Sequence, residues 1–444
     1  MGRKGKVAYL YDGEVGGAYY GIKHPMKPHR MRMTNELIIE YGLADHLDVY
    51  KPNRATAAQL KEFHTGDYIQ FLERAKPETV TEQEVEHYNV IEDSPIFDGV
   101  FQFCQIYAGA SIHGAQKLIQ GDYDIAINWS GGLHHAKKSQ AEGFCYVNDL
   151  VLAILELLKY HARVLYLDLD VHHGDGVEEA FITSDRVMTV SFHRYGQLFF
   201  PGTGSIDEIG FGAGKHYTLN IPFESGLTDS QFWSVFQPVM QKVMDVYQPG
   251  AVVLQCGADS LGGDKLGDFN LSIRQHAEAV DFMKKFGLPM LVTGGGGYKK
   301  RNVARCWTYE TAVLVGKTDL ITDQLPNNKY LDNFRNEKED ITRVPTASAD
   351  KMNVDRRGSR GDSLNKPAQL ERIKLKALQY MSKLEAAPGH GFYERQPDAM
   401  LPEWRNVSAC DEDAAMHDYA VKHLLLKDIP DVKLFEEDVS WNHG

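Results

Sequence analysis

Apolar segments of the chain alternate with segments of helical periodicity. Five short apolar segments are each followed by a glycine-rich or polar turn: 123–129, 162–170, 186–193, 250–257 and 288–295. Apolar residues recur at helical spacing in three longer segments: 148–160, 232–243 and 272–287. Strands that alternate with helices are typical of βα units. The pattern predicts an α/β fold with a single large doubly wound parallel β-sheet and helices on both faces.

The C-terminal quarter of the chain has a different pattern. Residues 334–369 are polar and charged, which predicts a flexible excursion after a domain at 1–333. An amphipathic helix is expected within 370–390, packed back on the core. Its apolar face would contain Leu370, Ile373, Ala377, Met381 and Leu384. Residues 391–444 are expected to form an acidic tail.

Composition and charge narrow the possible partners. The net charge of −13 disfavours direct nucleic-acid binding and suits a basic partner. The five cysteines form no CxxC pair, which disfavours both a disulfide framework and a thiolate zinc site. No segment approaches the roughly 20 apolar residues of a membrane span, and the N-terminus does not resemble a secretory signal. We therefore expect no membrane partner.

Histidines, carboxylates and one phenol follow the apolar segments directly. Loops at the carboxyl ends of parallel strands converge, so we expect these side chains in one cleft at that edge of the sheet. The candidates are His134, His135, Asp168, Asp170, His172, Asp175, Asp259 and Tyr298.

The segment "LDLDVHHGD" predicts a metal site. Alternation along an extended chain places Asp168, Asp170 and His172 on one side of the backbone. Burying several carboxylates is costly unless a cation or histidines compensate them, so a buried ion-pair cluster is the alternative interpretation. Carboxylate and imidazole ligands without thiolate suit a divalent ion such as zinc. We predict Asp170, His172 and Asp259 as its ligands.

The remaining candidates predict acid–base chemistry. Asp168 and Asp175 would orient His134 and His135, because a carboxylate that accepts the Nδ1 proton fixes the tautomer of the ring. Tyr298 follows four glycines and would donate a hydrogen bond to an oxyanion. Together these groups predict metal-assisted hydrolysis of a carbonyl compound.

Three nearby residues are expected to be structural. Single residues in packed loops have structural roles in most proteins, and we assign such roles to His173, His193 and Cys145.

Longer motifs around these residues resemble those of one enzyme family. From about Val7 to Leu325 the sequence resembles the class I histone deacetylases of the arginase-deacetylase fold. The motifs occur in the family's order: HPMKPHRMRM, EDSPIFDG, WSGGLHHAKKSQAEGFCYVND, LDLDVHHGDGVEEAF, FFPGTG, CGADSL, FNLSI and GGGGYKKRNVARCW.

The resemblance implies zinc-dependent hydrolysis of acetylated lysine in histone tails, with release of acetate and repression of transcription. His135 would be the main base and acid, and Tyr298 would bind the amide oxygen. Arg30 would lie near an internal cavity that releases acetate. A narrow substrate channel is implied, with Gly143, Phe144 and Phe200 as its walls and Leu266 at its mouth. Asp93 would hold the backbone amides of the substrate.

The resemblance further implies two monovalent cation sites, for potassium. The first would involve Asp168, Asp170, His172, Ser191 and Phe192. The second would involve Phe181, Ser184, Val187 and Tyr217.

An inositol phosphate bridging the chain to a corepressor subunit is also implied. It would bind Lys27, Lys265 and Arg301. Lys265 replaces the family's usual arginine, which keeps the charge but loses the bidentate fork. The family resemblance implies a nuclear location, with the cytoplasm as a second location.

Other functions remain open on the same residues. A deacetylase of small acetylated amines, such as polyamines, needs the same site with a different entrance. A non-catalytic chromatin scaffold would be expected to lack a ligand or the phenol, and none is missing. A binuclear arginase-type site is disfavoured, because the Asp259 loop reads ADSLGGD without an Asp-x-Asp pair.

Overall fold

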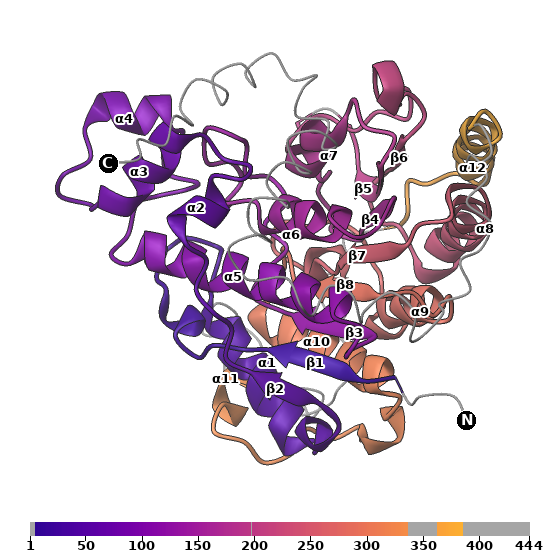
Figure 1. Cartoon of the computed structure of the whole chain (residues 1–444). Helices are drawn as coiled ribbons and strands as arrows, with labels where there is room; N and C mark the ends of the chain where they lie inside the picture. Colours follow the sequence, from indigo (N-terminus) through magenta and orange to yellow (C-terminus); the bar gives the residue numbers. More distant parts are fainter. Residues whose placement is uncertain (1–4, 197, 336–361, 385–444) are drawn as a thin grey trace, which may run out of the picture.

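The computed structural model describes residues 5–196, 198–335 and 362–384, which form one α/β domain built around a single parallel sheet (Figure 1). Its strand order is β2-β1-β3-β8-β7-β4-β5-β6, and every pair of neighbours is parallel. The strands are β1 Val7–Leu10, β2 Asp48–Tyr50, β3 Ile125–Asn128, β4 Val164–Asp168, β5 Val187–Arg194, β6 Thr218–Phe223, β7 Ala251–Gln255 and β8 Met290–Thr293. The predicted fold class is confirmed.

Helices cover both faces of the sheet. In Figure 1, α5 and α6 lie on one side of the strands, and α8, α9 and α12 lie on the other. The helices are α1 His29–Glu40, α2 Ala57–Leu60, α3 Gly66–Arg74, α4 Glu82–His87, α5 Val100–Ile119, α6 Asp149–Leu158, α7 Asp175–Phe181, α8 Asp229–Tyr247, α9 Ile273–Lys284, α10 Lys300–Val315, α11 Leu331–Arg335 and α12 Pro367–Met381. No helix in the described ranges is long and apolar enough to cross a membrane.

Coverage on both faces explains which strands the sequence predicted. The central strands β3, β4, β7 and β8 are buried along their whole length, so they appear as continuous apolar segments. Three strands were not predicted: β1, which has only four residues, and the edge strands β2 and β6. β2 has only three residues and is largely exposed, and β6 contains Pro222, which is tolerated at a sheet edge.

The strand register brings polar residues together at the carboxyl edge of the sheet. Asp168 ends β4, and it pairs in register with Ser191 of β5 on one side and Gln255 of β7 on the other. Thr293, the last residue of β8, pairs with Gln255 and with Asn128 of β3. The loops that follow these strands therefore begin side by side.

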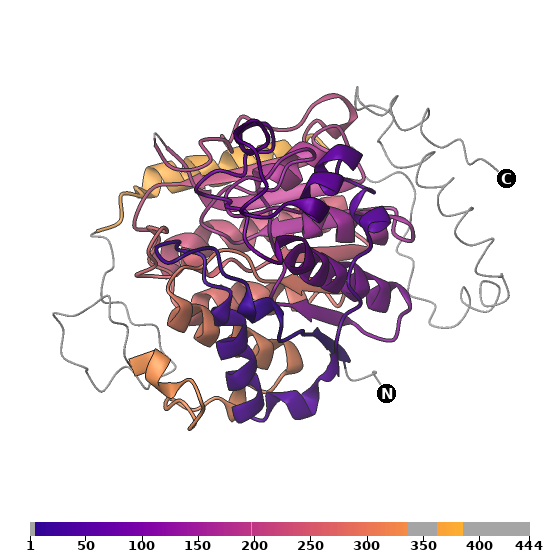
Figure 2. The same cartoon turned by 90° about the vertical axis from the view of Figure 1, so that its left-hand side faces the viewer.

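The last helix of the described residues packs back on the domain, and it overlaps the span 370–390 in which a returning helix was expected. It is α12, which begins at Pro367 and packs against α8 and β6. It runs along the upper edge of the view in Figure 2, in yellow. Asn365, just before it, accepts a hydrogen bond from the Glu224 amide (2.8 Å) and donates one to the Glu224 carbonyl (2.8 Å).

The predicted excursion at 334–369 lies mainly outside the described residues, but its two ends are helical. Phe334 is buried within α11, and residues 367–369 belong to α12. The acidic tail expected at 391–444 also lies outside the described residues. Within the described ranges, the cysteines are buried and free.

Candidate active site

Three buried residues at the carboxyl edge of the sheet form a group that could hold a metal ion. They are Asp170 and His172, from the loop after β4, and Asp259, from the loop after β7. Nδ1 of His172 lies 3.0 Å from Oδ1 of Asp170 and 3.2 Å from Oδ2 of Asp259. One ligand atom from each residue lies within 4.8 Å of the others. The sequence predicted this set.

The electrostatics of this group favour a bound cation. Burial opposes a charged His172 ring, yet hydrogen bonds to Asp170 and Asp259 outweigh it and raise the pKa of His172 to about 10. Burial and the neighbouring Asp170 carboxylate raise the pKa of Asp259 to about 7. Two carboxylates this close repel each other, and a divalent ion would relieve that repulsion. The donor set therefore fits a metal such as zinc.

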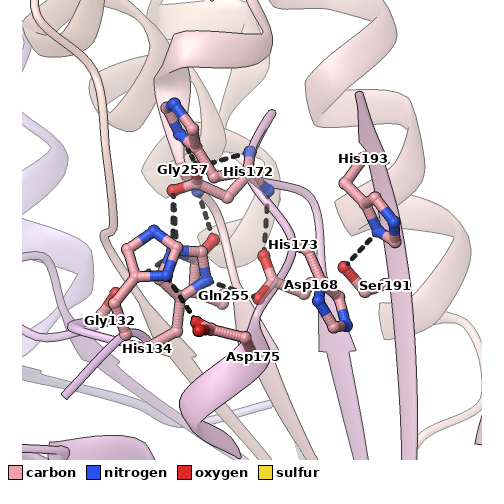
Figure 3. Close-up of polar contacts among 12 residues, drawn as sticks. Gly132, His134, Asp168, His172, His173, Asp175, Ser191, His193, Gln255 and Gly257 are labelled. Atoms are coloured by element: carbon pink, nitrogen blue, oxygen red, sulfur yellow. Dashed lines mark hydrogen bonds and ion pairs between the residues drawn. The ribbon is translucent and has the colours of Figure 1, made fainter. Parts of the chain in front are cut away.

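Gln255 holds the Asp170 carboxylate and was missed by the sequence analysis. Its Nε2 donates to Oδ2 of Asp170 at 2.9 Å. Its Oε1 accepts from the Gly257 amide at 2.7 Å (Figure 3). The Gly296 amide donates to the same Asp170 oxygen at 2.8 Å. A polar side chain at the end of an apolar strand was the signal that could have found Gln255.

His134 and Asp168 form the first histidine–carboxylate pair. Nδ1 of His134 donates to Oδ2 of Asp168 at 2.7 Å. Asp168 is fully buried and also accepts hydrogen bonds from the Tyr166 hydroxyl and the Asp170 amide. Burial disfavours the charged ring, but the Asp168 and Asp170 carboxylates outweigh burial and raise the pKa of His134 to about 9. This ring is therefore suited to carry a positive charge.

His135 and Asp175 form the second pair. Nδ1 of His135 donates to Oδ1 of Asp175, also at 2.7 Å. Burial and the neighbouring His134 ring lower the pKa of His135 to about 3, so this ring is neutral at neutral pH. Its tautomer has the proton on Nδ1, which leaves Nε2 as the proton acceptor. The second ring is therefore suited to act as a base.

A glycine loop after β8 brings Tyr298 to the metal group. A Cβ atom on Gly296 would lie 1.9 Å from Oδ2 of Asp259, so only glycine allows this approach. The Asp264 carboxylate accepts a hydrogen bond from the Tyr298 amide at 2.8 Å. The rings of Tyr298 and His172 are 6.4 Å apart. Burial raises the pKa of Tyr298, which keeps its hydroxyl protonated and able to donate.

Arg30 supports the same loop. Its guanidinium is buried, donates to the carbonyl oxygens of Gly295 (2.6 Å) and Gly297, and lies over the Trp307 ring. The family resemblance implied that Arg30 lies near an internal cavity, and that assignment stays a prediction. Its hydrogen bonds to Gly295 and Gly297 position the backbone that carries Tyr298.

Aromatic side chains surround the group on the side of the predicted channel. The Phe200 ring lies 4.8 Å from the His135 ring, and the Phe144 ring lies 5.6 Å from the Tyr298 ring. A Cβ atom on Gly143 would lie 2.6 Å from the His135 ring and 2.9 Å from Phe200. Glycine at this position therefore lets Phe200 pack against the base.

Two further channel candidates lie on neighbouring loops. Leu266 is partly exposed and belongs to the loop of Asp264, which binds its amide. Asp93 is exposed, and its carbonyl oxygen lies 3.0 Å from Nε2 of His24, whose ring contacts Phe144. Both candidates therefore lie on loops connected to the glycine loop and to Phe144.

The residues predicted for potassium fall into two groups in the fold. Ser191 and Phe192 lie in β5 beside Asp168, and the Ser191 hydroxyl interacts with Nδ1 of His193 at 2.8 Å (Figure 3). The second group lies near the start of β5, at the opposite end of that strand. It consists of Phe181, Ser184, Val187 and Tyr217. Both sites stay predictions.

His173 and His193 have packing partners that agree with structural roles. His173 contacts Glu178 at 2.7 Å and Thr203 at 2.8 Å, and His193 donates to the Gly204 carbonyl at 2.8 Å. These contacts fasten the segment that carries Phe200 to the sheet.

The basic residues predicted for an inositol phosphate occupy three segments near the site. Lys27 donates to the carbonyl oxygens of Gly21 and Ile22, both at 2.9 Å. Lys265 precedes Leu266, and Arg301 lies in the first turn of α10, just after the glycine loop. A shared anion site stays a prediction.

The fold and this geometry define a class of protein. A buried Asp-His-Asp group, two histidine–carboxylate pairs and a protonated phenol at the carboxyl edge of a parallel sheet are the parts of a metal-dependent hydrolase.

Comparison with known proteins identifies the family. A sequence model described as the histone deacetylase domain matches residues 24–314. Histone deacetylase 1 of Oryza sativa subsp. japonica is 55% identical over 404 residues, covering 90% of this chain and 74% of that protein. Histone deacetylase 19 of Arabidopsis thaliana is 53% identical over 404 residues (90% and 77%), and histone deacetylase 1 of Homo sapiens is 51% identical over 415 residues (93% and 83%). The chain belongs to the histone deacetylase family.

Proposed function

We propose that this protein uses zinc to hydrolyse N6-acetyl-lysine in histone tails, releasing acetate, and that it thereby represses transcription. The observation that carries the proposal is the complete set of groups at one buried edge: Asp-His-Asp, two histidine–carboxylate pairs and Tyr298. The net charge of −13 supports a basic substrate such as a histone tail.

Asp170, His172 and Asp259 would hold the zinc ion. When bound, zinc would act as a Lewis acid on the amide carbonyl and on the attacking water. The chain contributes the orientation of the ligands, because Gln255 and the Gly296 amide fix the Asp170 carboxylate.

His135 would move the proton. Asp175 accepts the Nδ1 proton, so Nε2 takes a proton from the attacking water and returns it to the lysine nitrogen as the amide bond breaks. Tyr298 donates a hydrogen bond to the carbonyl oxygen as negative charge builds on it. His134, held by Asp168, supplies positive charge beside the reacting atoms.

Phe144 and Phe200 would enclose the aliphatic part of the lysine side chain, with Gly143 between them and the base. Leu266 would contact the peptide at the mouth, and Asp93 would accept hydrogen bonds from its backbone amides. These roles are supported by the family resemblance and by the closeness of these aromatic rings to His135 and Tyr298.

Two further ligands belong to the proposal. Potassium would bind beside the zinc ligands, where Ser191 pairs with Asp168 in the sheet, and at the second predicted site at the start of β5. An inositol phosphate would bind Lys27, Lys265 and Arg301 and join the chain to a corepressor subunit. We propose that these complexes act in the nucleus.

The proposal is tested with a zinc-loaded full-length chain and two substrates, an acetyl-lysine histone peptide and a free acetylated polyamine. We expect turnover of the peptide, loss of turnover in the His135→Ala and Tyr298→Phe variants, and loss after chelation that added zinc restores. Unchanged turnover in both variants, or insensitivity to chelation, would contradict the mechanism. Faster turnover of the polyamine would contradict the substrate class.

A further inference from the structure

Lys137 lies two residues after His135, and both side chains contact the Asp175 carboxylate. Its Nζ lies 2.6 Å from Oδ2 of Asp175 and 3.0 Å from Oε2 of Glu179. The Lys137 side chain is only 18% exposed and that of Asp175 10%, whereas that of Glu179 is 66% exposed. The Lys137–Asp175 contact is therefore the buried part of this cluster, and Glu179 is its solvent-exposed end.

The two oxygens of Asp175 have different partners. Oδ1 accepts from Nδ1 of His135 at 2.7 Å, and Oδ2 contacts Nζ of Lys137 at 2.6 Å. A carboxylate held at one oxygen can rotate about its Cβ–Cγ bond, whereas one held at both oxygens cannot rotate without losing a contact. Lys137 therefore restricts the plane of the carboxylate that orients the base.

Lys137 also balances charge. An ionised carboxylate in a site this buried needs an opposite charge nearby. His135 is neutral, so it supplies a hydrogen bond but no charge. Burial opposes the ammonium form, but Asp175 and Glu179 outweigh burial and hold the pKa of Lys137 above its ordinary value. The ammonium group therefore supplies the countercharge that a neutral ring does not.

We propose that Lys137 is a positioning residue of the deacetylation reaction: it fixes the Asp175 carboxylate, and through it the His135 ring, and it balances the charge of that carboxylate. The inference rests on the proposed function, because it assigns Lys137 to the step in which His135 moves a proton. It predicts an effect on turnover and not on substrate binding, since Lys137 contacts the base through Asp175 alone.

Lys159 offers a matched control. It is another largely buried lysine, 12% exposed, with Nζ 2.8 Å from a carboxylate oxygen of Glu156, beyond the C-terminal end of α6. Lys159→Gln therefore removes a comparable ion pair without touching either histidine pair. A loss of activity through destabilisation alone would appear in both lysine variants.

The experiment compares Lys137→Gln, Lys137→Arg, Asp175→Asn, the Lys137→Gln/Asp175→Asn double variant and Lys159→Gln in the zinc-loaded full-length chain. kcat and KM on an acetyl-lysine peptide and thermal unfolding are measured for each. We expect Lys137→Gln to lower kcat about 10-fold to 100-fold with KM changed less than about twofold. Lys137→Arg should recover most of the loss, and Lys159→Gln should leave kcat unchanged.

The double variant tests the coupling directly. If Lys137 acts through Asp175, the double variant loses much less than the product of the two single losses. Losses that multiply would overturn the proposal, as would a Lys137→Gln kcat within about twofold of the wild type. If Lys137→Gln does not fold, Lys137→Met takes its place in the same cycle with Asp175→Asn, and the same two outcomes decide the question. A wild-type chain without turnover would contradict the proposed function instead, independently of Lys137.

Discussion

The two histidine–carboxylate pairs have the same local geometry but opposite electrostatics. In each, Nδ1 donates to an aspartate oxygen at 2.7 Å, and the two rings lie side by side with centroids 3.9 Å apart. Yet the pKa of His134 is raised to about 9, and that of His135 is lowered to about 3. A histidine bonded to an aspartate therefore does not by itself have a defined protonation state.

The difference in pKa comes from the charged groups that surround each ring. His134 faces two carboxylates, Asp168 and Asp170, and their combined attraction outweighs burial. His135 faces one carboxylate that is shared with Lys137, and the neighbouring His134 ring repels a second positive charge. One ring is thus suited to be a cation and the other to be a base, which divides acid–base work between adjacent residues.

Removing each ring in turn gives the largest expected contrast. We expect His135→Ala to lower kcat/KM about 1,000-fold, because the proton acceptor is lost, and His134→Ala to lower it about 10-fold to 100-fold. Steady-state kinetics on an acetyl-lysine peptide, with zinc content measured in both variants, checks this order. Equal losses at equal zinc content would break the distinction between base and cation.

Low pH should destabilise the folded segment that carries His134 and His135. His64 is buried, donates from Nδ1 to the Lys138 carbonyl and accepts at Nε2 from the Asn148 amide. The Asn148 side chain in turn donates to the carbonyl oxygens of His134 and Ala136. Burial lowers the pKa of His64 from 6.5 to about 4, so the unfolded chain binds this proton more readily than the folded one.

The folded state should therefore lose stability as the pH falls from 6.5 towards 4. The expected loss from His64 is about 3 kcal/mol, roughly 100-fold in the folding equilibrium. Urea unfolding at pH 7.5, 5.5 and 4.5 measures it, with His64→Gln as the variant that cannot titrate. The free energy of unfolding of the variant should fall by about 3 kcal/mol less than that of the wild type over this pH range. Parallel curves for the two proteins would exclude His64 as the cause.

Asp168→Asn isolates the charge on the first pair. The substitution keeps the shape of the side chain but removes one of the two carboxylates that raise the pKa of His134. We expect kcat/KM to fall about 10-fold to 100-fold, as for other partners of ligands and bases. A fall as large as that of His135→Ala would show that the two pairs are equally essential.

Among these variants, Tyr166→Phe should have the smallest effect on kcat/KM. It removes one hydroxyl from Asp168, which keeps its contacts with His134 and the Asp170 amide. One lost hydrogen bond corresponds to about 1 kcal/mol, or about fivefold in kcat/KM. The same assay measures the change in kcat/KM. A fall of about 100-fold would show that Tyr166 acts together with His134 and Asp168 as a triad.

The sequence predicted what depends on local pattern. Apolar segments located most of the central strands, and the residues that follow them predicted that Asp168 and Asp175 orient His134 and His135. Which aspartate supports which histidine was implied by the family resemblance. The sequence did not predict Gln255, Lys137 or Tyr166, because their importance depends on which side chain lies opposite after folding. Three strands were also missed. β2 is short and largely exposed, β6 has its apolar pattern interrupted by Asn220 and Pro222, and β1 has only four residues.

The return of the chain at α12 bears on how much of it must be kept together. The histone deacetylase domain match ends at residue 314. Apolar residues of α12 are nevertheless buried against α8 and β6, which come earlier in the chain: Leu370, Ile373, Ala377 and Met381. Truncation at residue 314 would remove α12 and uncover apolar surface on α8 and β6, against which it packs. A shortened chain for expression should therefore keep α12 together with the rest of the domain.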